Sequence, residues 1–164
     1  MKDMVKNNKK NIFYFFIIFV IFLIDRATKL IMINLDGLYG VKNYALTSFI
    51  NLELIWNSGI AFGMLSFEKS FYYNLITSII IIITIVILIM MVKTSGFQKY
   101  GLIMIFGGSI GNIFDRLFYS SVPDFIDIHF KNFHWFIFNV ADIFITLGVL
   151  ILIYCELIKE KTHD

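Results

Sequence analysis

The sequence predicts an α-helical membrane protein with four transmembrane helices, and three observations lead to this fold class. Hydrophobic residues make up 59% of the 164 residues, and the mean hydropathy is +0.80. A soluble domain of this length could not bury so much apolar surface. The apolar residues are gathered into four stretches, each near the roughly 20 residues that cross a bilayer core as a helix. Polar residues within three of these stretches gather near one end.

The predicted spans cover residues 12–33, 71–92, 100–117 and 136–158. The basic N-terminus followed by an apolar stretch is similar to a secretory signal peptide, but the stretch is long and no small-residue cleavage site follows it. We therefore expect it to be retained as the first helix. Residues 1–164 show no internal repeat of the kind that inverted-repeat transporters carry, so a single membrane domain is expected.

Two connections, residues 34–70 and 118–135, lie on the same side of the predicted bundle, while the 93–99 connection is only a turn. Within the first, "YALTSFINLELIW" is rich in aromatic and β-branched residues with partial alternation. This pattern predicts one or two strands at the membrane surface. His129, His134 and Trp135 in the second connection are expected to form an interfacial belt with no catalytic role.

The distribution of lysine predicts the orientation. The two tails and the 93–99 turn hold eight lysines, whereas the other loops hold three, or six basic residues when Arg26, Lys29 and Arg116 near helix ends are included. Basic loops favour the cytoplasmic side. Both termini are therefore expected in the cytoplasm, with residues 34–70 and 118–135 outside.

In this orientation the unusual polar residues of the spans fall at the outer membrane boundary. Asp25 and Lys29 stand at i, i+4, which predicts an ion pair. Asn112, Asp115 and Arg116 stand at i, i+3 and i+4 on one helix face, and Arg116 could pair with Asp115 or bind phosphate headgroups. Structural roles are favoured for the charged residues of both groups.

Asp124 and Asp142 are the residues for which a functional reading is favoured over a structural one. Asp124 lies in the second outer connection, and Asp142 follows Asn139 at i, i+3 in the fourth span. An ionised group at the bilayer centre costs on the order of 3 kcal/mol, so such residues usually have a partner or a function. Asn139 could equally form a helix–helix hydrogen bond, and Asp127 could be a solvated loop residue or a helix cap.

Other classes of protein remain open at this point. A small membrane transporter or channel component would use polar residues through the whole membrane depth, yet the inner halves of the spans carry almost no charge. A non-catalytic scaffold would leave Asp124 and Asp142 unexplained. A net charge of +2 is too small to indicate nucleic acid, and the single cysteine, Cys155, excludes an internal disulfide and makes a structural zinc site improbable.

Five sequence blocks, taken in order, resemble the type II signal peptidase family of bacteria, the lipoprotein signal peptidases. They are "DRATK" (25–29), "NSGIAFG" (57–63), "GGSIGNIFDR" (107–116), "VPDFID" (122–127) and "FNVAD" (138–142). Each block alone is weak, but the five in this order with this topology are specific. Ser109 replaces the usual alanine of the third block, and Pro123 fills a variable position of the fourth.

The resemblance implies an intramembrane-type aspartic endopeptidase that removes the signal peptide from diacylglyceryl-modified prolipoproteins, cutting just before the lipidated cysteine. It implies a multi-pass protein of the bacterial cytoplasmic membrane with its site at the outer face, in contact with membrane lipids. It also implies a small β-cradle and a surface helix in the first outer loop, inhibition by globomycin-type cyclic peptides, and no metal or other cofactor.

Residue roles also follow from the resemblance. The implied catalytic pair is Asp124 and Asp142. The residues implied to bind substrate or shape the site are Asn57, Gly59, Asn112, Arg116 and Asn139, and the implied polar support is Asp25, Lys29 and Asp115. Two carboxylates suit peptide hydrolysis because an ionised one can take a proton from water while a protonated one donates to the carbonyl oxygen. Two close carboxylates share one proton, since ionising both is costly.

Overall fold

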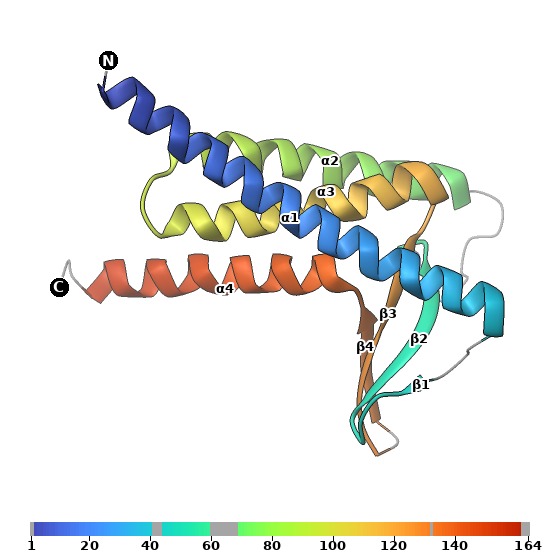
Figure 1. The fold of residues 1–164 in the computed structure, drawn as a ribbon. Coiled ribbons are helices and arrows are strands. Elements are labelled where there is room, and N and C mark those ends of the chain that lie inside the picture. The colour runs from blue at the N-terminus through green and yellow to red at the C-terminus, as the bar shows by residue number, and fades with distance from the viewer. Residues whose placement is uncertain (1, 41–43, 60–68, 132, 162–164) are drawn as a thin grey trace.

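The computed structural model describes residues 2–40, 44–59, 69–131 and 133–161. Four helices and one four-stranded sheet make up this part of the chain (Figure 1). In chain order they are α1 (Lys2–Tyr39), β1 (Tyr44–Ala45), β2 (Ile50–Asn57), α2 (Lys69–Lys93), α3 (Gln98–Tyr119), β3 (Val122–Phe130), β4 (Phe133–Phe138) and α4 (Val140–Lys161). Both ends of the described chain lie at one end of the helix bundle, and the sheet extends from the other (Figure 1).

Helix α3 is the centre of the bundle, because α1, α2 and α4 all pack against it. Half of its most apolar segment is buried, compared with 17% for α2 and 11% for α4. Small residues allow this packing. A Cβ added at Gly107 would come within 3.1 Å of Ile21 in α1, and one added at Gly108 would come within 2.5 Å of the Ala141 carbonyl oxygen in α4. Gly107 therefore allows close packing of α3 against α1, and Gly108 allows close packing of α3 against α4.

Among the described residues, three helices are long and apolar enough to cross a membrane: Phe71–Lys93 of α2, Gln98–Tyr119 of α3 and Val140–Lys159 of α4. The prediction of four such spans is thus confirmed for these three. Helix α1 is not among the spans found in this part of the chain, so its crossing of the membrane stays a prediction. The fourth helix also begins later than predicted, because residues 136–138 are the end of β4, where Ile137 and Phe138 pair with β3.

The sheet is antiparallel throughout, in the order β1-β2-β3-β4. The expected β-cradle in the first outer loop is present as β1 and β2, but the sheet is larger than expected, since β3 and β4 come from the second connection and its boundary with the fourth helix. A surface helix was also expected in the first loop, and residues 41–43 and 60–68 of that loop lie outside the described residues. The pairing of β2 with β3 joins the two connections into one structure.

Register places one end of β2 against the start of β3. Asn57 is opposite Val122, Trp56 is opposite Pro123, and Ile55 is opposite Asp124, beyond an irregularity between Leu52 and Ile55. Residues 122–125 of β3 are all buried. The Asp124 side chain of β3 is therefore buried at the junction of the sheet with the helices.

Candidate active site

Two aspartates meet at this junction through Asn139, the residue that precedes α4. Asn139 and Asp142 form a reciprocal capping box: the Asp142 backbone N–H donates to Asn139 Oδ1 at 3.1 Å, and the Asn139 backbone N–H donates to Asp142 Oδ2 at 3.1 Å. The side-chain amide of Asn139 then donates to Asp124 Oδ1 at 2.6 Å. One buried asparagine therefore starts the helix and connects both carboxylates.

Asp124 accepts a second hydrogen bond from Asn57 in β2. Asn57 Nδ2 donates to Asp124 Oδ2 at 2.8 Å, while Asn57 Oδ1 accepts the Gly59 backbone N–H at 2.7 Å. Gly59 has φ +75°, and an added Cβ would lie 3.2 Å from Arg116 Nη1. Glycine suits this turn for both reasons. Because the Asn57 carbonyl is occupied by the turn, its amide N–H groups face the aspartate.

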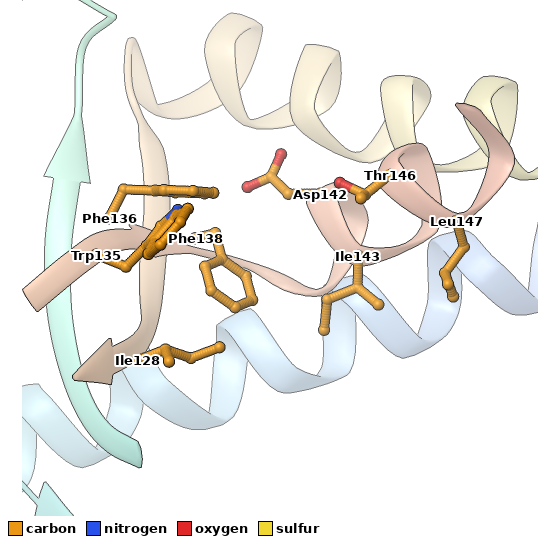
Figure 2. A pocket seen from close by; sticks show the side chains of 8 residues that line it. All are labelled: Ile128, Trp135, Phe136, Phe138, Asp142, Ile143, Thr146 and Leu147. Carbon is orange, nitrogen blue, oxygen red and sulfur yellow. The ribbon is translucent and has the colours of Figure 1, made fainter. Parts of the chain in front are cut away.

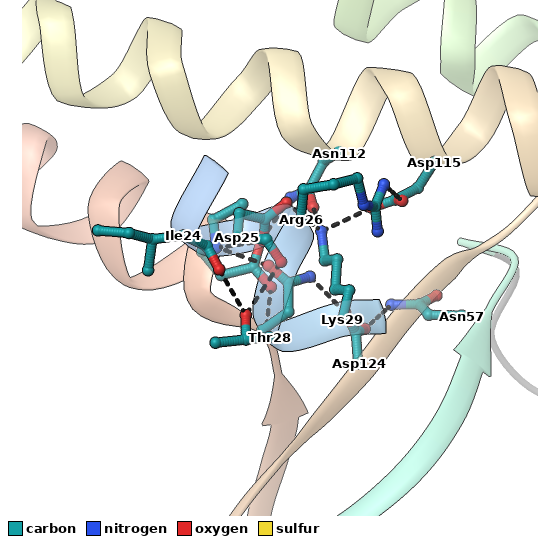
Figure 3. A network of polar contacts seen from close by, with 12 residues as sticks. Ile24, Asp25, Arg26, Thr28, Lys29, Asn57, Asn112, Asp115 and Asp124 are labelled. Atoms are coloured by element: carbon teal, nitrogen blue, oxygen red, sulfur yellow. Dashed lines mark hydrogen bonds and ion pairs between the residues drawn. The ribbon is translucent and has the colours of Figure 1, made fainter. Parts of the chain in front are cut away.

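Asp142 likewise accepts from an asparagine whose carbonyl is occupied. Asn112 Nδ2 donates to Asp142 Oδ1 at 2.8 Å, and Lys29 Nζ donates to Asn112 Oδ1 at 2.9 Å. Lysine has no acceptor atom, so the Asn112 amide can satisfy both neighbours only with its oxygen toward Lys29 and its nitrogen toward Asp142. Figure 3 shows the part of this chain that joins Lys29 of α1 to Asn112 of α3.

Lys29 is fully buried among carboxylates. Its ammonium donates to Asp25 at 2.9 Å and to Asp115 at 2.6 Å, and Asp115 also pairs with Arg26 (Figure 3). The other Asp25 oxygen accepts the Ala141 backbone N–H at 3.0 Å, at the start of α4. This network joins α1, α3 and α4. The ion pair predicted between Asp25 and Lys29 is confirmed.

Arg116 does not pair with Asp115, contrary to one of the two alternatives that its spacing left open. Its Nε and Nη1 atoms are buried and have no hydrogen-bond partner among the described residues. The guanidinium lies beside Gly59 and 5.9 Å from the centre of the Tyr73 ring, and the Tyr73 hydroxyl donates to the Arg116 carbonyl at 2.7 Å. A half-buried cation with unused donors can bind an incoming acceptor oxygen.

An apolar cavity of about 320 Å³ opens next to Asp142, between β3, β4 and α4. Figure 2 shows the Asp142 carboxylate between the aromatic side chains of β4 and Thr146. The remaining lining residues are aliphatic or aromatic: Ile128, Trp135, Phe136, Phe138, Ile143 and Leu147. An apolar group in this cavity would lie beside a carboxylate that can take part in proton transfer.

The two carboxylates differ in their surroundings. Burial raises the pKa of Asp124 from the usual 3.8 to about 6, against the hydrogen bonds from Asn57 and Asn139, which lower it. The nearby charge of Asp142 contributes a smaller increase to the pKa of Asp124, and the more distant Lys29 a small decrease. Asp142 lies in the first turn of α4, where the positive end of the helix dipole stabilises negative charge.

The structure brings all ten predicted site residues to this region. Sequence reasoning missed Arg26, the second partner of Asp115, although it stands inside the "DRATK" block, and it missed Tyr73, which no motif marks. The reading of Asp127 as a solvated loop residue is wrong, because Asp127 is fully buried and bonded to His134 Nδ1 at 2.7 Å. In the described part of the chain, no cluster of three or more His, Cys, Asp or Glu residues could hold a metal ion.

Three helices of membrane-spanning length, a small antiparallel sheet at one end of the bundle and two aspartates bonded to one asparagine define the class: an α-helical membrane protein with a pair of carboxylates at the junction of helices and sheet. The family model described as "Signal peptidase (SPase) II" matches residues 17–158. The chain belongs to this family. It is thus a signal peptidase II, an aspartic peptidase with lipoprotein signal peptidase activity and a multi-pass membrane protein of bacteria.

Similar proteins agree with this assignment. The chain is 49% identical to the lipoprotein signal peptidase of Pelagibacter ubique, over 98% of this chain and 99% of that protein. It is 41% identical to the lipoprotein signal peptidase of Thermodesulfovibrio yellowstonii, over 87% and 92%. A solved bacterial membrane enzyme superposes with a TM-score of 0.69 at 28% identity, covering 88% of this chain and 92% of that one. Family membership decides for a peptidase over the transporter or channel alternative.

Proposed function

We propose that Asp124 and Asp142 are the catalytic pair and that they cleave diacylglyceryl-modified prolipoproteins just before the lipidated cysteine. The observation that carries this proposal is the shared asparagine: Asn139 bonds both carboxylates, and each carboxylate accepts one further amide. The family implies prolipoprotein substrates. Peptide hydrolysis by an aspartic peptidase uses two neighbouring carboxyl groups, and Asp124 and Asp142 are proposed to be these two groups.

Their surroundings favour different roles for the two aspartates. Asp124, whose pKa is raised by burial, is the residue to carry the shared proton and donate it to the carbonyl oxygen of the scissile bond. Asp142, at the start of α4, is the residue to stay ionised and take a proton from the attacking water. After the attack Asp142 holds a proton and Asp124 is ionised; as the C–N bond breaks, Asp142 gives its proton to the leaving amine and Asp124 takes one from a hydroxyl group of the intermediate, which restores the starting state.

Substrate contacts follow from the groups around the pair. The apolar cavity beside Asp142 suits an alkyl part of the substrate, either an acyl chain or an apolar side chain of the signal peptide. Arg116 keeps free donors for a backbone carbonyl, and Gly59 leaves space beside them. Asn57, Asn112 and Asn139 hold the carboxylates, while Asp25, Lys29 and Asp115 support them from α1 and α3.

Location in the membrane is part of the same proposal. Both termini face the cytoplasm, and the sheet and the aspartate pair lie at the outer face of the cytoplasmic membrane, with 1–164 acting as one membrane domain. The lysine asymmetry supports this orientation. At that depth the acyl chains of the substrate remain in lipid while water reaches the scissile bond. Globomycin-type cyclic peptides are expected to compete for the site.

The test uses purified protein and a synthetic lipobox peptide, with and without diacylglycerol on its cysteine, and mass analysis of the products. We expect one cut, immediately before the lipidated cysteine. Equal rates on the two peptides in one detergent would remove the lipid from recognition. Near-normal turnover after Asp124→Asn or Asp142→Asn, per mole of folded protein, would contradict the proposed pair. A reporter fused after Asp164 tests orientation, and an outer location would overturn it.

A further inference from the structure

Two neighbouring hollows lie at the end of the bundle that carries the termini, far from the aspartate pair. One, of about 590 Å³, is bounded by α1, the end of α2, the turn that follows it and Phe106 of α3. The other, of about 470 Å³, lies between α1 and the start of α3. Tyr14 lines both, so the two hollows flank a single aromatic ring.

Four lysines line these hollows, and no acidic residue does: Lys9 and Lys10 belong to the smaller one, and Lys93 and Lys99 to the larger. None of the four forms an ion pair with a described residue. The Lys99 ammonium lies 4.8 Å from the centre of the Tyr14 ring, which fixes it at the boundary between the two hollows. Its N–H donors remain available for an anion.

Much of the lining of the larger hollow is apolar. Phe15 and Ile18 of α1, Leu88 and Met91 of α2 and Phe106 of α3 all contribute to it. Helices α1 and α2 are connected mainly through α3, which packs against both. Hollows between helices that are lined by both lysines and apolar side chains match the two halves of a phospholipid.

We propose that this site binds a phospholipid with an anionic headgroup, its phosphate among the lysines and one acyl chain in the groove between α1 and α2. Basic pockets between membrane helices bind anionic lipids in this way. A zwitterionic lipid would add a second cation beside the four lysines and no net negative charge, and free phosphate would leave the apolar lining unused. Under the proposed orientation the lipid comes from the cytoplasmic leaflet, and the inference does not depend on the peptidase reaction.

The experiment is native mass spectrometry of the full-length protein released from micelles that contain equal amounts of phosphatidylglycerol and phosphatidylcholine with identical acyl chains. We expect retention of phosphatidylglycerol to exceed that of phosphatidylcholine by about tenfold. The double variant Lys93→Gln/Lys99→Gln should lose most of this preference, whereas Lys93→Arg/Lys99→Arg should keep it. The matched control is Lys131→Gln, at the β3–β4 turn at the other end of the molecule, which should behave as the parent protein.

Equal retention of the two lipids by the parent protein would overturn the proposal, as would an equal loss in Lys131→Gln. Competition by inorganic phosphate as strong as that by the lipid would show a plain anion site and would also overturn it. If the glutamine double variant does not fold, the lipid preference is measured instead for Lys93→Gln alone and for the parent protein at increasing salt concentration. A preference for phosphatidylglycerol that does not weaken with salt would contradict the lysine contacts.

Discussion

Replacing Asp124 by asparagine should abolish turnover and stabilise the folded protein at neutral pH. The side chain is only 3% exposed, and burial raises its pKa from 3.8 to about 6. The folded state therefore holds a proton between about pH 4 and pH 6 that the unfolded chain has already released. Stability of the parent protein must fall as the pH rises through this window, and an uncharged residue at position 124 removes that loss.

The magnitude follows from the same values. A rise of the pKa from 3.8 to about 6 corresponds to roughly 3 kcal/mol, at about 1.4 kcal/mol per pH unit. Asparagine also introduces a mismatch, because Asn57 and Asn139 both donate to the carboxylate and the new amide can accept only one of them. That mismatch costs about 1 kcal/mol. We expect a net gain of about 1–2 kcal/mol above pH 7, and none below pH 4.

The assay is thermal unfolding in detergent, followed by the fluorescence of Trp56 and Trp135 between pH 3.5 and pH 8. The midpoint of Asp124→Asn minus that of the parent protein should increase through pH 4–6 and then level off. A difference in midpoint that does not change with pH would refute the raised pKa of the buried Asp124 carboxyl group. A variant that is stabilised but still cleaves the lipidated peptide would refute the catalytic assignment while leaving the electrostatic reasoning intact.

Three further predictions concern the helices around the pair. Asp142→Asn should also abolish turnover, but it should not stabilise the protein at pH 7.5 because it weakens the capping box and the interaction with the helix dipole. The double variant Asp124→Asn/Asp142→Asn should have little less turnover than either single variant, since the two aspartates act as one unit. Lys29→Met leaves two buried carboxylates short of a partner and should cost about 3–5 kcal/mol, measured as folded yield by size-exclusion chromatography. Gly108→Ala should cost about 1–3 kcal/mol in a thermal assay, whereas Gly37→Ala, with no neighbour within 4 Å, should be neutral.

Sequence patterns predicted the helices better than the sheet, for a physical reason. Long apolar runs of about bilayer length identify a helix without knowledge of its neighbours. Strand β3 depends on pairing with β2, which comes from another part of the chain, and β4 depends in turn on pairing with β3. Residues 136–138 continue an apolar run, and only their pairing with β3 makes them strand rather than helix. The pattern alone contains no sign of that partner.

The candidate site shows the same division. Periodicity alone predicted the contact of Asp25 with Lys29, because both residues are on one helix. Arg116 is also on a predicted face, yet Asp115 pairs with Arg26 and Lys29 of α1 instead. Contacts between helices depend on the rotation of each helix about its axis. The orientation of the three asparagine amides could not be predicted at all, since it depends on donors from other elements.

Those three amides explain how the aspartates are held in place before any substrate arrives. Each amide oxygen accepts from a group that cannot accept in return: a backbone N–H for Asn57 and Asn139, and the Lys29 ammonium for Asn112. A rotated amide would place its N–H groups against these donors and lose both hydrogen bonds. The amide nitrogens are therefore directed at the two carboxylates. Donors fixed in this way need no reorganisation when charge moves during a reaction, which is the physical basis of electrostatic preorganisation. Buried Lys29 thus contributes to the geometry of the proposed pair through Asn112 while it neutralises the carboxylates of α1 and α3.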